Sequence, residues 1–173
     1  DLLDNLVVDS ILYHQAPIPF TRPGSNLLTI NFPASINTGV KDSVSIYYQG
    51  APTTTGFGSF TVSAHAGTPI IWTLSEPYGA KEWWPCKNGL DDKTDSLDVI
   101  ITTPDTYFAS SNGILASETV AGGKRTVYWK HRYPIATYLV AFATTNYQVQ
   151  NDTIQLKNTV LPLNQYVYPE SSV

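Results

Sequence analysis

The sequence predicts an all-β fold of antiparallel strands, and three observations support that prediction. Apolar and polar residues alternate over several short runs, which is the period of strands with one buried face. Val, Ile, Thr and Tyr are abundant, and no window has an apolar stripe at the 3.6-residue period of a helix. Turn-forming residues separate the runs, as is typical of a β-sandwich or barrel.

The individual strands follow from the alternation and from the turns between them. Alternating runs predict strands at 28–32, 44–48, 60–64 and 97–101. A meander of three further strands is predicted at 107–110, 114–119 and 126–132. Asn112-Gly113 and Gly122-Gly123 are predicted to be its hairpin connections, because these residues tolerate positive φ angles.

One segment departs from this pattern. From Ser75 to Asp95 the alternation stops, and the chain contains Trp83, Trp84 and several charged residues. Connections longer than about 12–15 residues in a compact domain are usually functional or disordered. Two adjacent tryptophans argue against disorder, so this connection is the first candidate for a functional segment.

Length and composition restrict the class of protein. The chain has 173 residues, which fits a single domain over 1–173, with 42% hydrophobic and 14% charged residues. The net charge of −4 and the scattered basic residues argue against a nucleic-acid partner, and no apolar run reaches the about 20 residues of a membrane span. Because Met is absent and the chain begins abruptly, we expect it to be a piece of a longer protein.

The residues suggest no catalytic or metal-binding group on this chain. His14, His65 and His131 lie far apart without the spacing of a zinc site, and no nucleophile elbow or phosphate-binding glycine loop occurs. Lys81 and Lys87 could lower the pKa of the Cys86 thiol, but a buried, inert cysteine is the preferred interpretation. The Asp91, Asp92, Asp95 and Asp98 cluster lacks EF-hand spacing, so a solvated acidic loop is preferred to a calcium site.

The aromatic residues leave two interpretations open. Trp72, Trp83, Trp84 and Trp129, with eleven tyrosines, could provide stacking surfaces for a sugar, or they could pack in a core and at interfaces. The first interpretation corresponds to a secreted carbohydrate-binding β-sandwich module. A structural or adhesion domain without ligand is a third option. Asn151-Asp152-Thr153 matches a glycosylation acceptor, and with the single cysteine and few charges it suggests an extracytoplasmic protein, either periplasmic or secreted.

A resemblance to a known family centres on the long connection. Residues 73–93 read Thr-Leu-Ser-Glu-Pro-Tyr-Gly-Ala-Lys-Glu-Trp-Trp-Pro-Cys-Lys-Asn-Gly-Leu-Asp-Asp-Lys. This resembles the signature loop of the N-terminal domain of gluzincin zinc aminopeptidases, the aminopeptidase N and leukotriene-hydrolase family. That loop typically reads Thr-Gln-Phe-Glu-Pro-x-x-Ala-Arg-x-x-Phe-Pro-Cys-x-Asp-x-Pro-x-x-Lys. Here Lys81, Asn88 and Leu90 replace the usual Arg, Asp and Pro.

Four flanking segments also resemble the family, in the family's order, so that the resemblance extends from about residue 6 to 169. Tyr47 to Gly50 resembles the Ile-x-Tyr-x-Gly strand end, and Gly56-Phe57 resembles the Gly-Phe before the signature. Ser111 to Gly113 resembles the Ser-Asn-Gly turn, and Tyr138 to Phe142 resembles the Tyr-Leu-x-Ala-Phe strand.

The resemblance implies a fold and a position in a larger enzyme. The fold would be a saddle-like β-sandwich of antiparallel strands that lacks the first strands of the family domain. The catalytic zinc domain, with its His-Glu-x-x-His motif, would follow residue 173, so zinc would be a cofactor of that domain and not of this chain. This chain alone would be inactive, and the parent protein would be a metallo-aminopeptidase that removes N-terminal residues from peptides.

The resemblance also implies the site residues. Glu76, with Pro77 and Tyr78 beside it, would bind the α-amine at the N-terminus of the peptide substrate. An α-amine has a pKa of about 7.7–8.0 and is mostly protonated at neutral pH. A carboxylate about 4 Å away offers about 4 kcal/mol at an effective dielectric near 20. The loop would be supported by Trp83, Trp84, Cys86 and Lys93, and the expected partners are the catalytic domain and the peptide.

Overall fold

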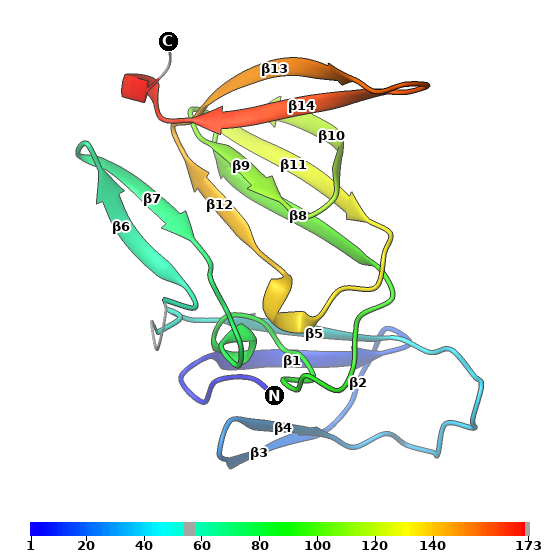
Figure 1. Cartoon of the computed structure of the whole chain (residues 1–173). Coiled ribbons are helices and arrows are strands. Elements are labelled where there is room, and N and C mark those ends of the chain that lie inside the picture. The colour runs from blue at the N-terminus through cyan, green and yellow to red at the C-terminus, as the bar shows by residue number, and fades with distance from the viewer. Residues whose placement is uncertain (54–57, 172–173) are drawn as a thin grey trace. The chain divides into compact units, whose positions relative to one another are not determined.

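The computed structural model describes residues 1–53 and 58–171 (Figure 1). Within these residues the chain forms fourteen strands and three short 3₁₀ helices, without an α-helix. All the strand pairs are antiparallel, so the predicted antiparallel all-β class is confirmed. No helix within these ranges has the length and apolar character that crossing a membrane requires.

The described residues divide into two compact units. The first unit comprises 1–60, 74–93 and 136–139, and the second comprises 61–73, 94–135 and 140–173. The long connection predicted from the sequence belongs mainly to the first unit. The assignment of 1–173 to a single domain stays a prediction.

The first unit contains a three-stranded sheet and a separate hairpin. The sheet has the order β2-β1-β5, and the hairpin pairs β3 with β4. His14 and Gln15 take positive φ angles of 49° and 67° in the turn between β1 and β2. Buried Leu2, Leu6 and Ile11 supply apolar packing. The bounds are β1 Val7–Tyr13, β2 Ala16–Pro17, β3 Phe20–Gly24, β4 Leu27–Ile30, β5 Val44–Gln49, and 3₁₀ helices η1 Ala80–Glu82 and η2 Thr137–Leu139.

The second unit contains three sheets. Their orders are β6-β7-β12-β9, β10-β11-β8 and β13-β14, and the last is the long orange and red ribbon in Figure 1. The strand bounds are β6 Thr61–His65, β7 Thr68–Trp72, β8 Leu97–Pro104, β9 Phe108–Ser111, β10 Ile114–Ala121, β11 Lys124–His131, β12 Phe142–Thr145, β13 Gln148–Gln155 and β14 Val160–Val167. The 3₁₀ helix η3 spans Pro169–Ser171.

The core of the second unit forms around Trp129 of β11. This side chain is 4% exposed and packs with Val127 and with Ala109 of β9, while Tyr166 of β14 lies against the same cluster. The indole Nε1 donates to the Ala109 carbonyl at 3.2 Å, which satisfies its buried donor. Trp129, Ala109 and Tyr166 come from the three different sheets and pack together. Trp129 is therefore a packing residue rather than a sugar-stacking surface.

The predicted meander is right at one connection and wrong at the other. Gly122 and Gly123 take φ angles of 59° and 71° and join β10 to β11 as a hairpin. Asn112-Gly113 is not a hairpin, because β9 pairs with β12 while β10 pairs with β11. The chain changes sheet there: the Ala141 N–H donates to Asn112 Oδ1 at 2.7 Å, and a Cβ on Gly113 would overlap the Lys130 carbonyl.

Of the segments that resemble the family, one differs from the strand that the resemblance implies, and another lies outside the described residues. In the segment from Tyr138 to Phe142, residues 138 and 139 belong to η2 and only Phe142 lies in a strand. Gly56-Phe57 lies outside the described residues.

The first unit is also organised by the guanidinium group of Arg22, a side chain that is 20% exposed. Its Nη2 donates to the carbonyls of Leu2 and Leu3 at 2.8 and 2.9 Å, and its Nη1 donates to the Leu6 carbonyl at 3.1 Å. It also pairs with Asp4 Oδ1 at 3.1 Å. The fork geometry of guanidinium lets one side chain bind several carbonyls of a segment without regular secondary structure.

We expect Arg22→Ala to lower the free energy of unfolding by about 2–3 kcal/mol, because several partly buried carbonyls lose a charged donor. Urea unfolding followed by circular dichroism measures this. Lys87→Ala, which removes the exposed ion pairs with Asp91 and Asp92, is the control and should change stability little. Equal losses in the two variants would contradict the role given to Arg22.

Candidate functional site

The centre of the long connection is a tight turn from Ser75 to Gly79. The Gly79 N–H donates to the Ser75 carbonyl at 2.8 Å, which closes the turn around Glu76, Pro77 and Tyr78. The two closing residues are buried, whereas the three enclosed residues are exposed, Tyr78 by 55%. The peptide bond between Glu76 and Pro77 is cis. The turn therefore presents a carboxylate and an aromatic ring to solvent from a fixed base.

The base of the turn is fixed by Ser59 and Trp83. The Trp83 indole Nε1 donates to Ser75 Oγ at 2.9 Å, and Ser75 Oγ donates to the Ser59 carbonyl at 3.4 Å. The Leu74 N–H donates to the same carbonyl at 3.3 Å. A Cβ at Gly79 would overlap the Ser59 hydroxyl and would come within 2.8 Å of Ser59 Cβ, so glycine is the residue that permits this close approach.

The Trp83-Trp84 pair supports the connection and does not form a flat surface. Both rings are half-buried, and their planes are tilted by 50° with centroids 6.0 Å apart. The Tyr48 hydroxyl of β5 donates to the Trp83 carbonyl at 2.8 Å, which links the connection to the three-stranded sheet. A sugar-stacking surface requires an open ring face, and these tilted, half-buried rings do not provide a shared one.

No described residue neutralises the carboxylate of Glu76. Within residues 1–53 and 58–171 it makes no hydrogen bond or ion pair, and the structure does not bring Lys93 to it. Lys93 is exposed, and its backbone N–H donates to Asp92 Oδ1 at 2.8 Å. The predicted site residues thus separate into the exposed turn, its two tryptophans, and a lysine elsewhere on the connection.

Cys86 is half-buried and lies beside the N-terminal segment. Its N–H donates to the Asp1 carbonyl at 3.0 Å. Burial raises the pKa of the Cys86 thiol to about 11, although the N-terminal amine and Lys81 act in the opposite direction. The thiol is therefore protonated at neutral pH, which agrees with the inert, buried cysteine preferred from the sequence.

Three supporting residues were missed by the sequence reasoning: Ser59, Ser75 and Gly79. Ser75 and Gly79 bracket Glu76-Pro77 at a spacing of four residues, which is a usable signal for a closed turn. Ser59 contacts the turn from 16 residues away, and no local pattern identifies it.

The described residues do not supply the donors of a zinc site. Across 1–53 and 58–171, no group of three or more His, Cys, Asp and Glu side chains could hold a metal ion. Two of the histidines have other partners: His14 pairs with Asp42 at 2.8 Å, and His65 pairs with Glu170.

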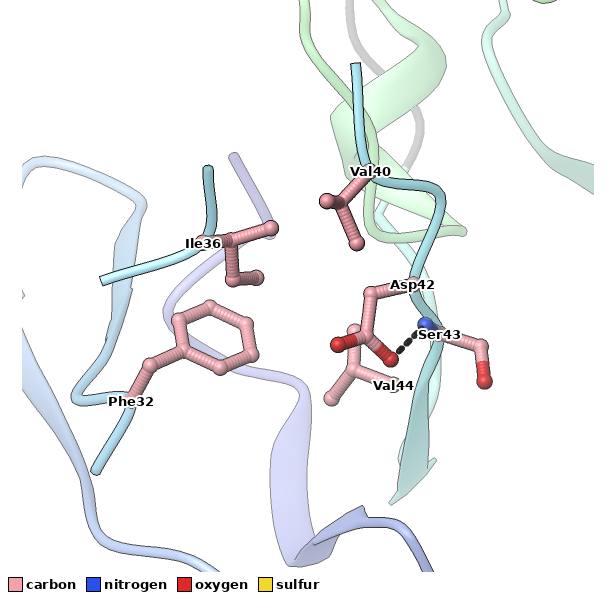
Figure 2. Close-up of a pocket in the computed structure, with 6 residues that line it drawn as sticks. All are labelled: Phe32, Ile36, Val40, Asp42, Ser43 and Val44. Carbon is pink, nitrogen blue, oxygen red and sulfur yellow. Dashed lines mark hydrogen bonds between the residues drawn. The ribbon is translucent and has the colours of Figure 1, made fainter. Parts of the chain in front are cut away.

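A second feature of the first unit is an apolar hollow of about 250 Å³ (Figure 2). It is lined by Phe32, Ile36, Val40, Asp42, Ser43 and Val44. The Asp42 carboxylate accepts from the Tyr13 hydroxyl at 2.6 Å and from the Ser43 N–H at 2.7 Å, and it contacts His14 Nε2 at 2.8 Å. The Tyr13 hydrogen bond is the largest cause that lowers the pKa of Asp42. Because its acceptors are occupied within the chain, this carboxylate is a weaker candidate than Glu76 for binding an external cation.

Several solved structures share the fold of this chain. A mutant M1 zinc metallopeptidase from Deinococcus radiodurans, bound to a Tyr-Ser-Ala substrate, aligns with a TM-score of 0.84 and 19% identity over 100% of this chain and 40% of its own. A two-domain M1 zinc metallopeptidase mutant bound to L-arginine aligns at 0.82 and 20% identity, over 96% and 38% of the two chains. Aminopeptidase A from Legionella pneumophila, in complex with aspartic acid, aligns at 0.73 and 20% identity, over 98% and 20%.

The family follows from the sequence match. The model of the Peptidase M1 N-terminal domain matches residues 7–139, so the chain belongs to that family, and the predicted β-sandwich class and the family resemblance are confirmed. A search of curated protein sequences gave no match. The chain spans two fifths or less of the length of these solved relatives.

We expect Gly79→Ala to lower the free energy of unfolding by about 1–3 kcal/mol, because the added methyl group overlaps Ser59. In a Ser59→Gly background the overlap is absent, so the same substitution should cost less than half as much. Urea unfolding of the four proteins of this double-mutant cycle measures the coupling. An equal cost in both backgrounds would exclude the close approach as the cause.

We expect Cys86 to react slowly with thiol reagents in the folded protein. Because its folded pKa of about 11 exceeds the unfolded value, the thiolate is scarce at pH 8 and the rate should rise as pH approaches 11. Folding stability should fall over the same range, since the unfolded thiol loses its proton first. Iodoacetamide labelling with and without urea tests this, and equal rates at pH 8 would contradict it.

Proposed function

We propose that this chain is the non-catalytic N-terminal domain of a zinc-dependent aminopeptidase and that its Ser75–Gly79 turn anchors the substrate α-amine. The observation that carries this proposal is the Glu76 carboxylate, which is exposed on a turn with a buried base and has no partner in the described part of the chain. The relatives' names support the aminopeptidase class, since they describe M1 zinc metallopeptidases and an aminopeptidase.

An exposed carboxylate alone is a weak anchor. Exposed ion pairs contribute about 0–1 kcal/mol, because solvent screens them. The proposed role therefore requires a further domain that covers the turn and excludes water. In that setting a protonated α-amine within hydrogen-bond distance of Glu76 would gain a charge-assisted interaction, and Tyr78 would add an aromatic wall beside it.

The anchor would restrict cleavage to the end of a peptide. A substrate held by its α-amine places its first peptide bond at a fixed distance from the anchor, and an internal peptide bond offers no such cation. Zinc and the general base belong, in this proposal, to the domain that follows the present chain. The residues described here contribute binding and orientation, and they transfer no proton.

We expect Glu76→Ala in the full-length protein to raise KM for peptides with a free N-terminus by about tenfold to a hundredfold. This corresponds to losing one hydrogen bond to a charged group, worth about 1.5–3 kcal/mol. The value of kcat should change less. Steady-state hydrolysis of aminoacyl-p-nitroanilides measures both quantities.

Asp91→Ala is the matched control, since it removes an exposed carboxylate from the same connection without touching the turn. Unchanged kinetics in Glu76→Ala, or an equal effect of Asp91→Ala, would remove Glu76 from the site.

A further inference from the structure

Asn88 joins two other parts of the long connection through the two ends of its side chain. Its Nδ2 donates to the Tyr78 carbonyl at 2.9 Å, and its Oδ1 accepts from the Lys81 N–H at 3.3 Å. Its backbone N–H donates to Asp1 Oδ2 at 3.1 Å. A carbonyl only accepts and a peptide N–H only donates, so these two neighbours define which end of the amide is nitrogen.

Among the described residues, the contact between Asn88 and the Tyr78 carbonyl is the one hydrogen bond that reaches the exposed part of the turn, Glu76 to Tyr78. Ser59 and Trp83 fix the base at Ser75. In the part of the chain that the structure describes, no other hydrogen bond reaches Glu76, Pro77 or Tyr78. The direction in which the Glu76 carboxylate points therefore depends on the buried base and on this single bond near the tip.

An amide is required for this contact. The aminopeptidase signature usually has Asp at the position of Asn88, and an ionised carboxylate accepts hydrogen bonds but donates none. It could still accept from the Lys81 N–H, but it would place a negative oxygen against the Tyr78 carbonyl. Asn88, one of the residues that depart from the signature, thus supplies the donor to the Tyr78 carbonyl.

We propose that Asn88 is a positioning residue for the substrate amine: its amide group fixes the Tyr78 carbonyl and thereby holds the Glu76 carboxylate in the orientation that receives the α-amine. This inference rests on the proposed function of Glu76. Asn88 does not contact the substrate, and its effect is transmitted through the two peptide units between Glu76 and Tyr78. Loss of one such neutral hydrogen bond corresponds to about a threefold to tenfold change in binding.

The test is a double-mutant cycle in the full-length protein, with Asn88→Asp and Glu76→Gln made singly and together. Asn88→Asp keeps the size of the side chain and the acceptor for Lys81 but removes the donor to Tyr78. We expect it to raise KM for aminoacyl-p-nitroanilides by about threefold to tenfold, with kcat within about twofold. In the Glu76→Gln background it should add less than twofold, because the carboxylate that it positions is absent.

Two controls make the result specific. Asn158→Asp introduces the same charge at the exposed end of the β13-β14 ribbon and should leave KM unchanged. Asn88→Ala removes the amide without adding a charge, so it should reproduce the rise in KM, and it decides the test if Asn88→Asp does not fold. Urea unfolding of each variant verifies that the folded protein is being measured.

The possible outcomes separate the two proposals. A loss in Glu76→Gln together with an additive or absent effect of the Asn88 variants overturns only the positioning role. Unchanged kinetics in Glu76→Gln overturns the anchor itself, and the positioning role with it. A rise in KM that disappears in the Glu76→Gln background supports both.

Discussion

The candidate site depends on one buried hydroxyl group. Ser75 Oγ accepts a hydrogen bond from the indole N–H of Trp83 and donates one to the Ser59 carbonyl. It therefore links three segments at the base of the turn. A hydroxyl can do both at once, which a methyl group or a carboxylate in the same place cannot do. Because the Ser75 carbonyl also closes the turn with Gly79, side chain and backbone of one residue set the position of Glu76.

The strand content was predictable where burial alternates along a strand. β5 and β8 alternate between more and less exposed residues along their whole length, and the sequence places strands there correctly. β13 and β14 pair only with each other and have long exposed stretches, so their residues show weak alternation and the sequence reasoning missed them. β9 was located correctly, but its partner was not, because sheet pairing depends on contacts far apart in the chain.

The candidate site was predictable only in part. The Glu76-Pro77 motif and the tryptophans that follow it identified the connection, and the family match over residues 7–139 agrees with that assignment. Physical reasoning from the sequence alone had no means to distinguish an exposed Glu76 from any other surface carboxylate. The supports are non-local: Ser59 and Tyr48 reach the connection across 16 and 35 residues, which no periodicity in the sequence encodes.

The short segment before β1 has a consequence for the connection that bears Glu76. The Cys86 N–H donates to the Asp1 carbonyl at 3.0 Å, and the Leu3 N–H donates to the Lys81 carbonyl at 2.8 Å, so the segment forms an extra edge along the connection that bears Glu76. A substitution that displaces residues 1–3 is therefore expected to weaken the support of that connection, even though none of these residues lies within it.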